Sequence, residues 1–120
     1  MSKPKVLVVD DDPVVLHLVA YALSSRGFEV YALSSPVQAL QLAKTILYLD
    51  MLVSDVNMLE MSGPELVTKI KQVCPTVAVV MMSADLAGPE LPGGVGFIGK
   101  PFTLTDLYSV VEKALARSLT

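Results

Sequence analysis

The sequence contains few of the residues that build disulfides, zinc sites or nucleic-acid surfaces. Of its 120 residues, one is cysteine, one is histidine and none is tryptophan. Because Cys74 stands alone, an intrachain disulfide is excluded, which fits a reducing cytoplasm. No CxxC pair or histidine cluster supplies zinc ligands. The net charge is −3 and no basic block is present, which argues against DNA or RNA binding by this chain.

Long apolar runs and processing signals are also missing. The apolar stretches are far shorter than the roughly 20 residues that cross a bilayer, and no signal peptide precedes the first strand-like run. We therefore expect a cytoplasmic protein that does not enter a membrane. A hydrophobic fraction of 52% with 18% charged residues argues against disorder. The length predicts one compact domain, residues 1–120.

Short apolar runs alternate with amphipathic segments along most of the chain. The runs predict strands over 5–9, 28–32, 51–54, 77–82 and 95–99. Between and after them, caps and spacing predict helices over 12–26, 35–48, 63–74 and from 103 onward. In the first helix, the residues that recur at helical spacing are Val14, Leu18, Tyr21 and Ala22. The alternation predicts an α/β fold, with a parallel sheet covered by helices on both faces.

The segment between the fourth and fifth predicted strands breaks this alternation. Residues 85–94 contain three glycines and two prolines. Both residue types destabilise helix interiors, proline through its missing N–H and ring clash, and glycine through its backbone entropy. We therefore predict a loop here, with at most one short turn of helix.

Polar residues stand where four of the predicted strands end. The first strand runs into Asp10-Asp11, the third into Asp55, the fourth into Ser83 and the fifth into Lys100. The carboxyl ends of parallel strands meet at one edge of the sheet, where ligands bind in open α/β folds. The sequence therefore predicts that these side chains converge on one site.

These residue types suit magnesium-assisted phosphoryl transfer. Carboxylates provide the hard oxygens that Mg²⁺ prefers, and crowding them is costly unless a cation offsets their charge. An aspartate oxygen can attack phosphorus to give an acyl phosphate. The metal and Lys100 would neutralise the oxygens of the moving phosphoryl group, and Ser83 would donate a hydrogen bond to it.

Nearly the whole chain resembles the receiver domain of two-component response regulators and hybrid sensor kinases. Four segments in register carry the resemblance: Val8-Val9-Asp10-Asp11, Ser54-Asp55-Val56-Asn57-Met58, Met82-Ser83-Ala84 and Lys100-Pro101-Phe102. It implies a flavodoxin-like three-layer sandwich with a five-stranded parallel sheet in the order 2-1-3-4-5. The interval from Ser83 to Lys100 is several residues shorter than usual, so the family's fourth helix is expected to be short or missing.

The resemblance also implies roles for individual residues. Asp55 matches the phosphoacceptor and Lys100 the phosphate-binding lysine, and Ser83 and Phe97 match the switch pair. The implied ligands of Mg²⁺, with Mn²⁺ as a substitute, are Asp10, Asp11, Asp55 and the backbone carbonyl of Asn57. The implied function is phosphorelay signalling, with a histidine kinase or histidine phosphotransfer protein as donor and an unidentified downstream protein or effector domain as output. Such a domain assists its own phosphorylation but is not an ordinary enzyme.

Some positions depart from the family pattern or allow a plainer interpretation. Leu59 stands where the family usually has proline, and Ser62 where it usually has aspartate. Phe97 lacks the hydroxyl of the usual tyrosine and is most simply a core aromatic. Asp12 reads as a helix cap, and His17 as a surface or boundary residue.

Two other functions remain open from the sequence. The first is a pseudo-receiver, which has the same fold and binds proteins without being phosphorylated. The second is a phosphatase, because the segment from Val6 to Val14 resembles the first motif of haloacid-dehalogenase-type phosphatases. The nucleophile separates the interpretations: Asp55 for the receiver and Asp10 for the phosphatase.

Overall fold

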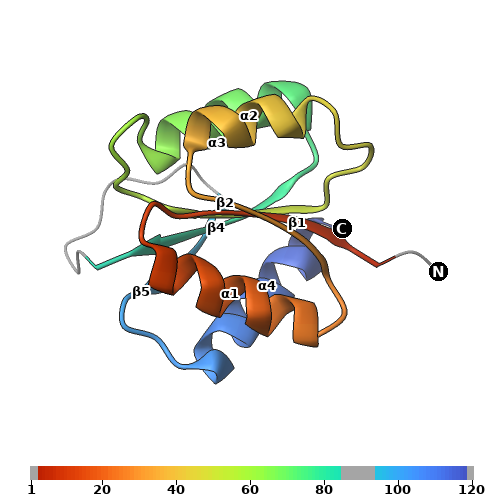
Figure 1. Ribbon diagram of the computed structural model, residues 1–120. Coiled ribbons are helices and arrows are strands. Elements are labelled where there is room, and N and C mark those ends of the chain that lie inside the picture. Colours follow the sequence, from red (N-terminus) through yellow and green to blue (C-terminus); the bar gives the residue numbers. More distant parts are fainter. Residues whose placement is uncertain (1–2, 85–93, 119–120) are drawn as a thin grey trace.

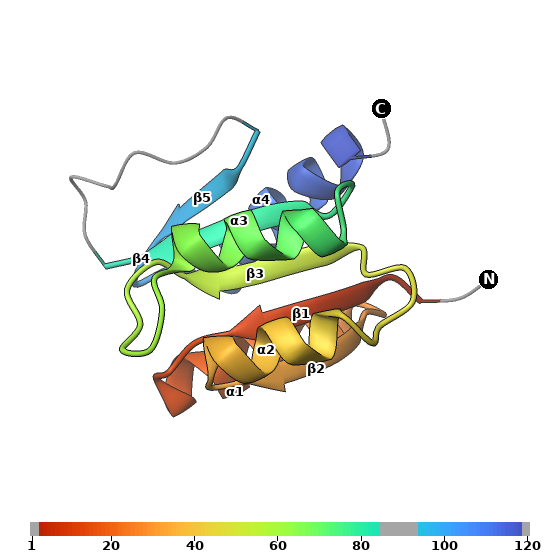
Figure 2. The same ribbon diagram turned by 90° about the horizontal axis from the view of Figure 1, so that it is seen from above.

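The computed structural model describes residues 3–84 and 94–118, which form a sheet between two layers of helices (Figure 1). All five strands are parallel: β1 (Lys5–Val9), β2 (Glu29–Leu33), β3 (Met51–Asp55), β4 (Ala78–Ser83) and β5 (Gly96–Gly99). Their spatial order is β2-β1-β3-β4-β5 (Figure 2). The predicted flavodoxin-like sandwich and its strand order are therefore confirmed.

Two helices cover each face of the sheet. Helices α1 (Pro13–Ser25) and α4 (Leu104–Ser118) lie on one face, and α2 (Pro36–Ala43) and α3 (Gly63–Val73) on the other (Figure 1). Side chains cap three of them: Asp12, Ser35 and Ser62 accept the N–H groups of Val14, Gln38 and Glu65. A proline follows each cap within two residues, because its missing N–H is unneeded in the first turn. The caps predicted at Asp12 and Ser35 are confirmed.

The sheet separates two apolar cores. In β1, Val6 and Val8 point to the α1/α4 side, and Leu7 and Val9 to the α2/α3 side. All four side chains have no solvent exposure. A strand buried on both faces has no polar side to alternate with, which explains the continuous apolar runs in the sequence.

Of the four residues that recur at helical spacing in α1, only Ala22 is buried. Val14 and Tyr21 are 75% and 73% exposed, and Leu18 is also exposed. The buried residues of the helix are Leu16, Val19, Ala22 and Leu23. Apolar residues surround most of α1, so their spacing fits more than one stripe, and only packing on the sheet decides which stripe is buried.

Helix α2 is shorter than predicted. It ends at Ala43 rather than near Tyr48. Thr45 follows the helix, and both its N–H and its hydroxyl donate to the Leu42 carbonyl, which closes a turn. Tyr48 then adopts a positive φ of 61°, a conformation that no helix interior allows. The chain is thereby turned toward β3.

The loop predicted between β4 and β5 lies outside the described residues, apart from its last residue, Gly94. On the α2/α3 face, Figure 2 shows both of these helices to one side of β5. Phe97 lies on β5 and is 40% exposed, so its interpretation as a core aromatic is wrong.

His17 is exposed, as expected for a surface residue. None of the helices within 3–84 and 94–118 combines the length and apolar composition needed to cross a bilayer.

Candidate functional site

Strand register brings the predicted site residues to one edge of the sheet. Val9 of β1 pairs with Ser54 of β3, so the next residue after each, Asp10 and Asp55, lie at the same level. Asp55 pairs with Met82, and Ser83 pairs with Gly99, the residue before Lys100. The ends of β1, β3, β4 and β5 therefore bring these side chains to within one residue of the same level along the sheet.

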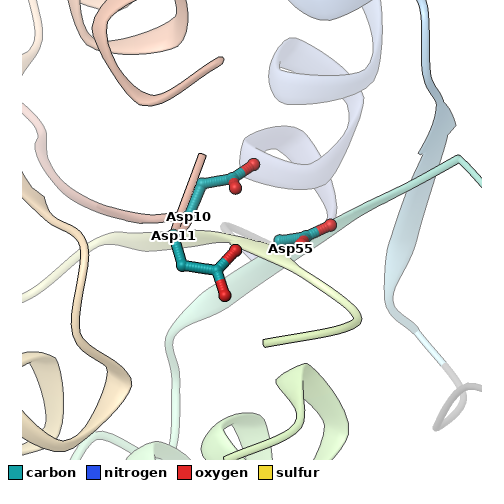
Figure 3. A group of neighbouring side chains, drawn as sticks. All are labelled: Asp10, Asp11 and Asp55. Atoms are coloured by element: carbon teal, nitrogen blue, oxygen red, sulfur yellow. The ribbon is translucent and has the colours of Figure 1, made fainter. Parts of the chain in front are cut away.

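Three carboxylates gather at this edge (Figure 3). One oxygen each from Asp10, Asp11 and Asp55 lies within 4.8 Å of the other two. Asp10 and Asp55 are buried, and Asp11 is exposed. The three acids therefore converge as the strand ends predict, and Asp11 places one side of the cluster in contact with solvent.

Lys100 is the cation that contacts the buried acids. Its Nζ lies 2.8 Å from Oδ2 of Asp10 and 3.1 Å from Oδ1 of Asp55. Burial alone would lower the pKa of Lys100, but the hydrogen bonds that Lys100 donates to Asp10 and Asp55, together with their negative charges, outweigh burial and raise it. The lysine is therefore held in its charged form beside the proposed acceptor.

The single positive charge of Lys100 does not neutralise the negative charges of the three carboxylates. Burial raises the pKa of Asp55, and the negative charge of Asp10 raises it further, although Lys100 acts in the opposite direction. A divalent cation would relieve this excess of negative charge. The donor set is made of oxygens only, as Mg²⁺ requires, and its solvent-facing side leaves room for the water ligands that Mg²⁺ keeps. The residues present therefore fit a magnesium ion.

The hydrogen bonds of the acids differ. Asp10 uses both oxygens: Oδ1 accepts the Asp12 N–H at 2.9 Å and Oδ2 accepts Lys100 Nζ. Asp11 accepts one N–H, from Leu59, at Oδ2. Asp11 is thus the better placed for direct ligation, whereas Asp10 suits contact through a water molecule.

The remaining predicted residues are Ser83, Asn57 and Phe97. Ser83 is 1% exposed at the end of β4, and its carbonyl accepts the Lys100 N–H at 2.7 Å. Asn57 is exposed in the loop two residues after Asp55. Phe97 points outward from β5, so it is not packed against the acids in this structure.

Sequence reasoning missed a requirement at Gly63. It treated this residue only as the start of a helix, but a Cβ here would lie 2.3 Å from both the Asp55 carbonyl oxygen and Met81 Cε. The Gly63 N–H also donates to the Val56 carbonyl at 2.7 Å. The absence of a side chain therefore lets α3 begin directly against the end of β3. A glycine that follows a strand-end acid by eight residues was the available signal.

Comparison with known proteins identifies the class. Residues 6–112 match the response regulator receiver domain family, and the chain belongs to that family. It is 32% identical over 117 residues to the transcriptional regulatory protein GlrR of Escherichia coli (strain K12), covering 93% of this chain. It is 39% identical over 121 residues to the two-component response regulator ORR12 of Oryza sativa subsp. japonica, covering 93% of this chain and 98% of ORR12.

Solved structures agree with this assignment. The crystal structure of the receiver domain from the hybrid histidine kinase CckA superposes with a TM-score of 0.82 at 30% identity, covering 92% of this chain and 98% of that one. The chain spans about a quarter of the length of GlrR. Receiver domains are signalling modules that interact with histidine kinases or phosphotransfer proteins and with effector domains.

Proposed function

We propose that this chain accepts a phosphoryl group on Asp55 from a histidine kinase or histidine phosphotransfer protein, in the presence of Mg²⁺. The observation that carries the proposal is the pairing of Lys100 Nζ with both Asp10 and Asp55 inside a cluster of three carboxylates. A lone strand-end acid would need no such partners. The same cluster on a receiver fold supports transfer rather than simple structural charge.

The transfer is an in-line displacement. An oxygen of Asp55 forms a bond to phosphorus, the bond from phosphorus to the donor histidine nitrogen breaks, and that nitrogen keeps the electron pair. Magnesium held by Asp10, Asp11, Asp55 and the Asn57 carbonyl would supply positive charge to the phosphoryl oxygens.

Lys100 and Ser83 complete the chemistry. Lys100 Nζ is within hydrogen-bond distance of Asp55 Oδ1 and would form an ion pair with the phosphoryl group once Asp55 carries it. Ser83 would donate its hydroxyl hydrogen to a phosphoryl oxygen from the end of the neighbouring strand. Phe97 would then turn inward from its exposed position, which would change the surface offered to a downstream protein or effector domain. We place this exchange in the cytoplasm.

The phosphatase alternative uses Asp10 as the nucleophile, and the geometry of Asp10 disfavours it. Its side chain has no solvent exposure, and both oxygens already accept hydrogen bonds. A nucleophile needs a lone pair directed at its substrate. The pseudo-receiver alternative lacks any comparable observation in its favour, because the acids and Lys100 are all present.

Intact mass after incubation with acetyl phosphate and Mg²⁺ tests the proposal. We expect the wild-type chain to gain one phosphoryl group, Asp55→Asn to gain none, and Asp50→Asn, an exposed acid at the other end of the sheet, to behave as wild type. Addition of EDTA should abolish the adduct. Because acyl phosphates hydrolyse, a negative result is repeated with beryllofluoride. Absence of both adducts would favour the pseudo-receiver, and loss of turnover in Asp10→Asn but not in Asp55→Asn would favour the phosphatase.

A further inference from the structure

The loop after β3 reaches across to the acid cluster through its backbone. The Leu59 N–H lies 3.3 Å from Oδ2 of Asp11, a residue 48 positions earlier in the chain. The Leu59 side chain is 96% exposed, so the contribution of this residue to the site comes from its amide. A proline at this position has no N–H and would make no such bond.

A second hydrogen bond anchors the same loop. The Ser35 hydroxyl donates to Oε1 of Glu60 at 2.6 Å, and its oxygen accepts the Gln38 N–H as the cap of α2. Glu60 is the residue after Leu59, so this bond ties the loop to the start of a helix. Asp11, Ser35, Leu59 and Glu60 line one hollow beside the acid cluster.

We propose that the Leu59 amide, held by the Ser35–Glu60 hydrogen bond, positions the Asp11 carboxylate for the divalent cation. The proposal rests on the metal site of the proposed function. Burial and Lys100 hold Asp10 and Asp55 in place, but Asp11 is exposed and the Leu59 amide is its hydrogen-bond partner. Mg²⁺ demands near-ideal octahedral geometry. A carboxylate that binds it through one oxygen keeps the other for the amide, and such outer partners orient ligands and raise metal affinity.

The matched pair Leu59→Pro and Leu59→Ala tests the amide. Both remove the exposed side chain, but only proline removes the N–H. Calorimetric titration with Mg²⁺ should give a Kd about tenfold higher for Leu59→Pro than for Leu59→Ala. This is the low end of the affinity loss seen when the hydrogen-bond partner of a metal ligand is removed, and we expect the low end because Asp11 is exposed. Leu59→Ala should match the wild type. Equal Kd values for the two variants would overturn the proposal.

The pair Glu60→Ala and Glu60→Gln tests the anchor and decides the matter if Leu59→Pro does not fold. Glutamine keeps an oxygen that accepts the Ser35 hydroxyl, and both variants lose the same charge, as does the distant control Glu112→Ala. We expect weaker Mg²⁺ binding in Glu60→Ala than in Glu60→Gln, with rescue by the glutamine. Identical binding in both would contradict an anchoring role.

The wild-type titration separates failure of this inference from failure of the proposed function. A wild-type chain that binds no Mg²⁺ and gains no phosphoryl group would overturn the metal site itself, and the positioning role with it. A wild-type chain that binds Mg²⁺ and is phosphorylated, while Leu59→Pro equals Leu59→Ala and Glu60→Ala equals Glu60→Gln, would overturn the positioning role alone.

Discussion

Charged groups are exposed at the amino end of the parallel sheet and buried at its carboxyl end. At the amino end, Oδ2 of Asp50 accepts the backbone N–H of Lys5 at 2.7 Å, and the side-chain Nζ of Lys5 donates to the Leu47 carbonyl at 2.9 Å. Both bonds are exposed to solvent. At the carboxyl end, Asp10 and Asp55 are buried beside Lys100, and Asp11 adds a third negative charge.

The difference favours the carboxyl end as the ligand-binding end, in agreement with the proposed function. Exposed groups at the amino end are hydrated, so their interactions contribute little to stability. Buried acids in excess over their cation are unfavourable in the isolated domain, because burial penalises each charge and like charges repel. A protein keeps such an arrangement where a bound cation or phosphoryl group makes use of it. The predictions that follow test this contrast, beginning with the largest expected effect.

Removal of Lys100 should cause the largest difference in stability between a variant at the carboxyl end and a variant at the amino end of the sheet. Lys100→Met leaves Asp10 buried without a charged partner, so we expect a loss of about 3 kcal/mol in the free energy of unfolding, the low end for a broken buried ion pair because Lys100 is partly exposed. Lys5→Met removes a cation whose hydrogen bond is exposed to solvent and should cost less than about 1 kcal/mol. Urea denaturation of both variants in EDTA makes the comparison. Equal losses would contradict the contrast.

Magnesium should stabilise the folded chain through the carboxyl end alone. A ligand that binds only the folded state adds about 2.7 kcal/mol at a free concentration one hundred times its Kd. We expect this gain in the wild type and in Asp50→Asn, and its loss in Asp11→Asn. Thermal unfolding with increasing MgCl₂ measures it, and a matched series with NaCl controls for ionic strength. If Mg²⁺ stabilised Asp11→Asn as much as the wild type, the cation would bind at another site.

The smallest effect concerns Asp55 itself. Without metal, Asp55→Asn removes one crowded charge and should stabilise the chain by about 1 kcal/mol at pH 7. Because the pKa of Asp55 is raised on folding, its unfavourable contribution is fully present above the folded pKa and fades as the pH falls through it toward 3.8. The advantage of Asp55→Asn should therefore shrink on acidification. Urea denaturation in EDTA at pH 7 and at lower pH tests this, and a constant difference would argue against a raised pKa.

Apolar runs and caps made the fold predictable. The strands were placed to within about one residue, because a strand buried on both faces is a continuous apolar run between polar turns. The predictions failed where several local solutions existed. In α1 apolar residues surround the helix, so only Ala22 of the four residues picked out by spacing is buried. Helix α2 was extended past Ala43 into residues that form a turn.

The candidate site was predictable in its acids but not in its supports. Asp10 and Lys100 each follow a strand and Asp55 is the last residue of one, so parallel topology alone brings them to one edge. The bond from the Leu59 amide to Asp11 joins positions 48 residues apart. No local pattern encodes it, because backbone N–H groups are the same in every residue except proline.

The sequence by itself determined the class of the protein, the parallel sheet and the set of ionisable groups at its carboxyl edge. These follow from periodicity, caps and strand-end residues, which are local properties of the chain. Only the tertiary structure decided how the charges are shared: Lys100 between two buried acids, Asp11 toward solvent and a loop amide. That outcome depends on strand register, burial and close backbone approach at Gly63, and these arise only when distant segments pack together.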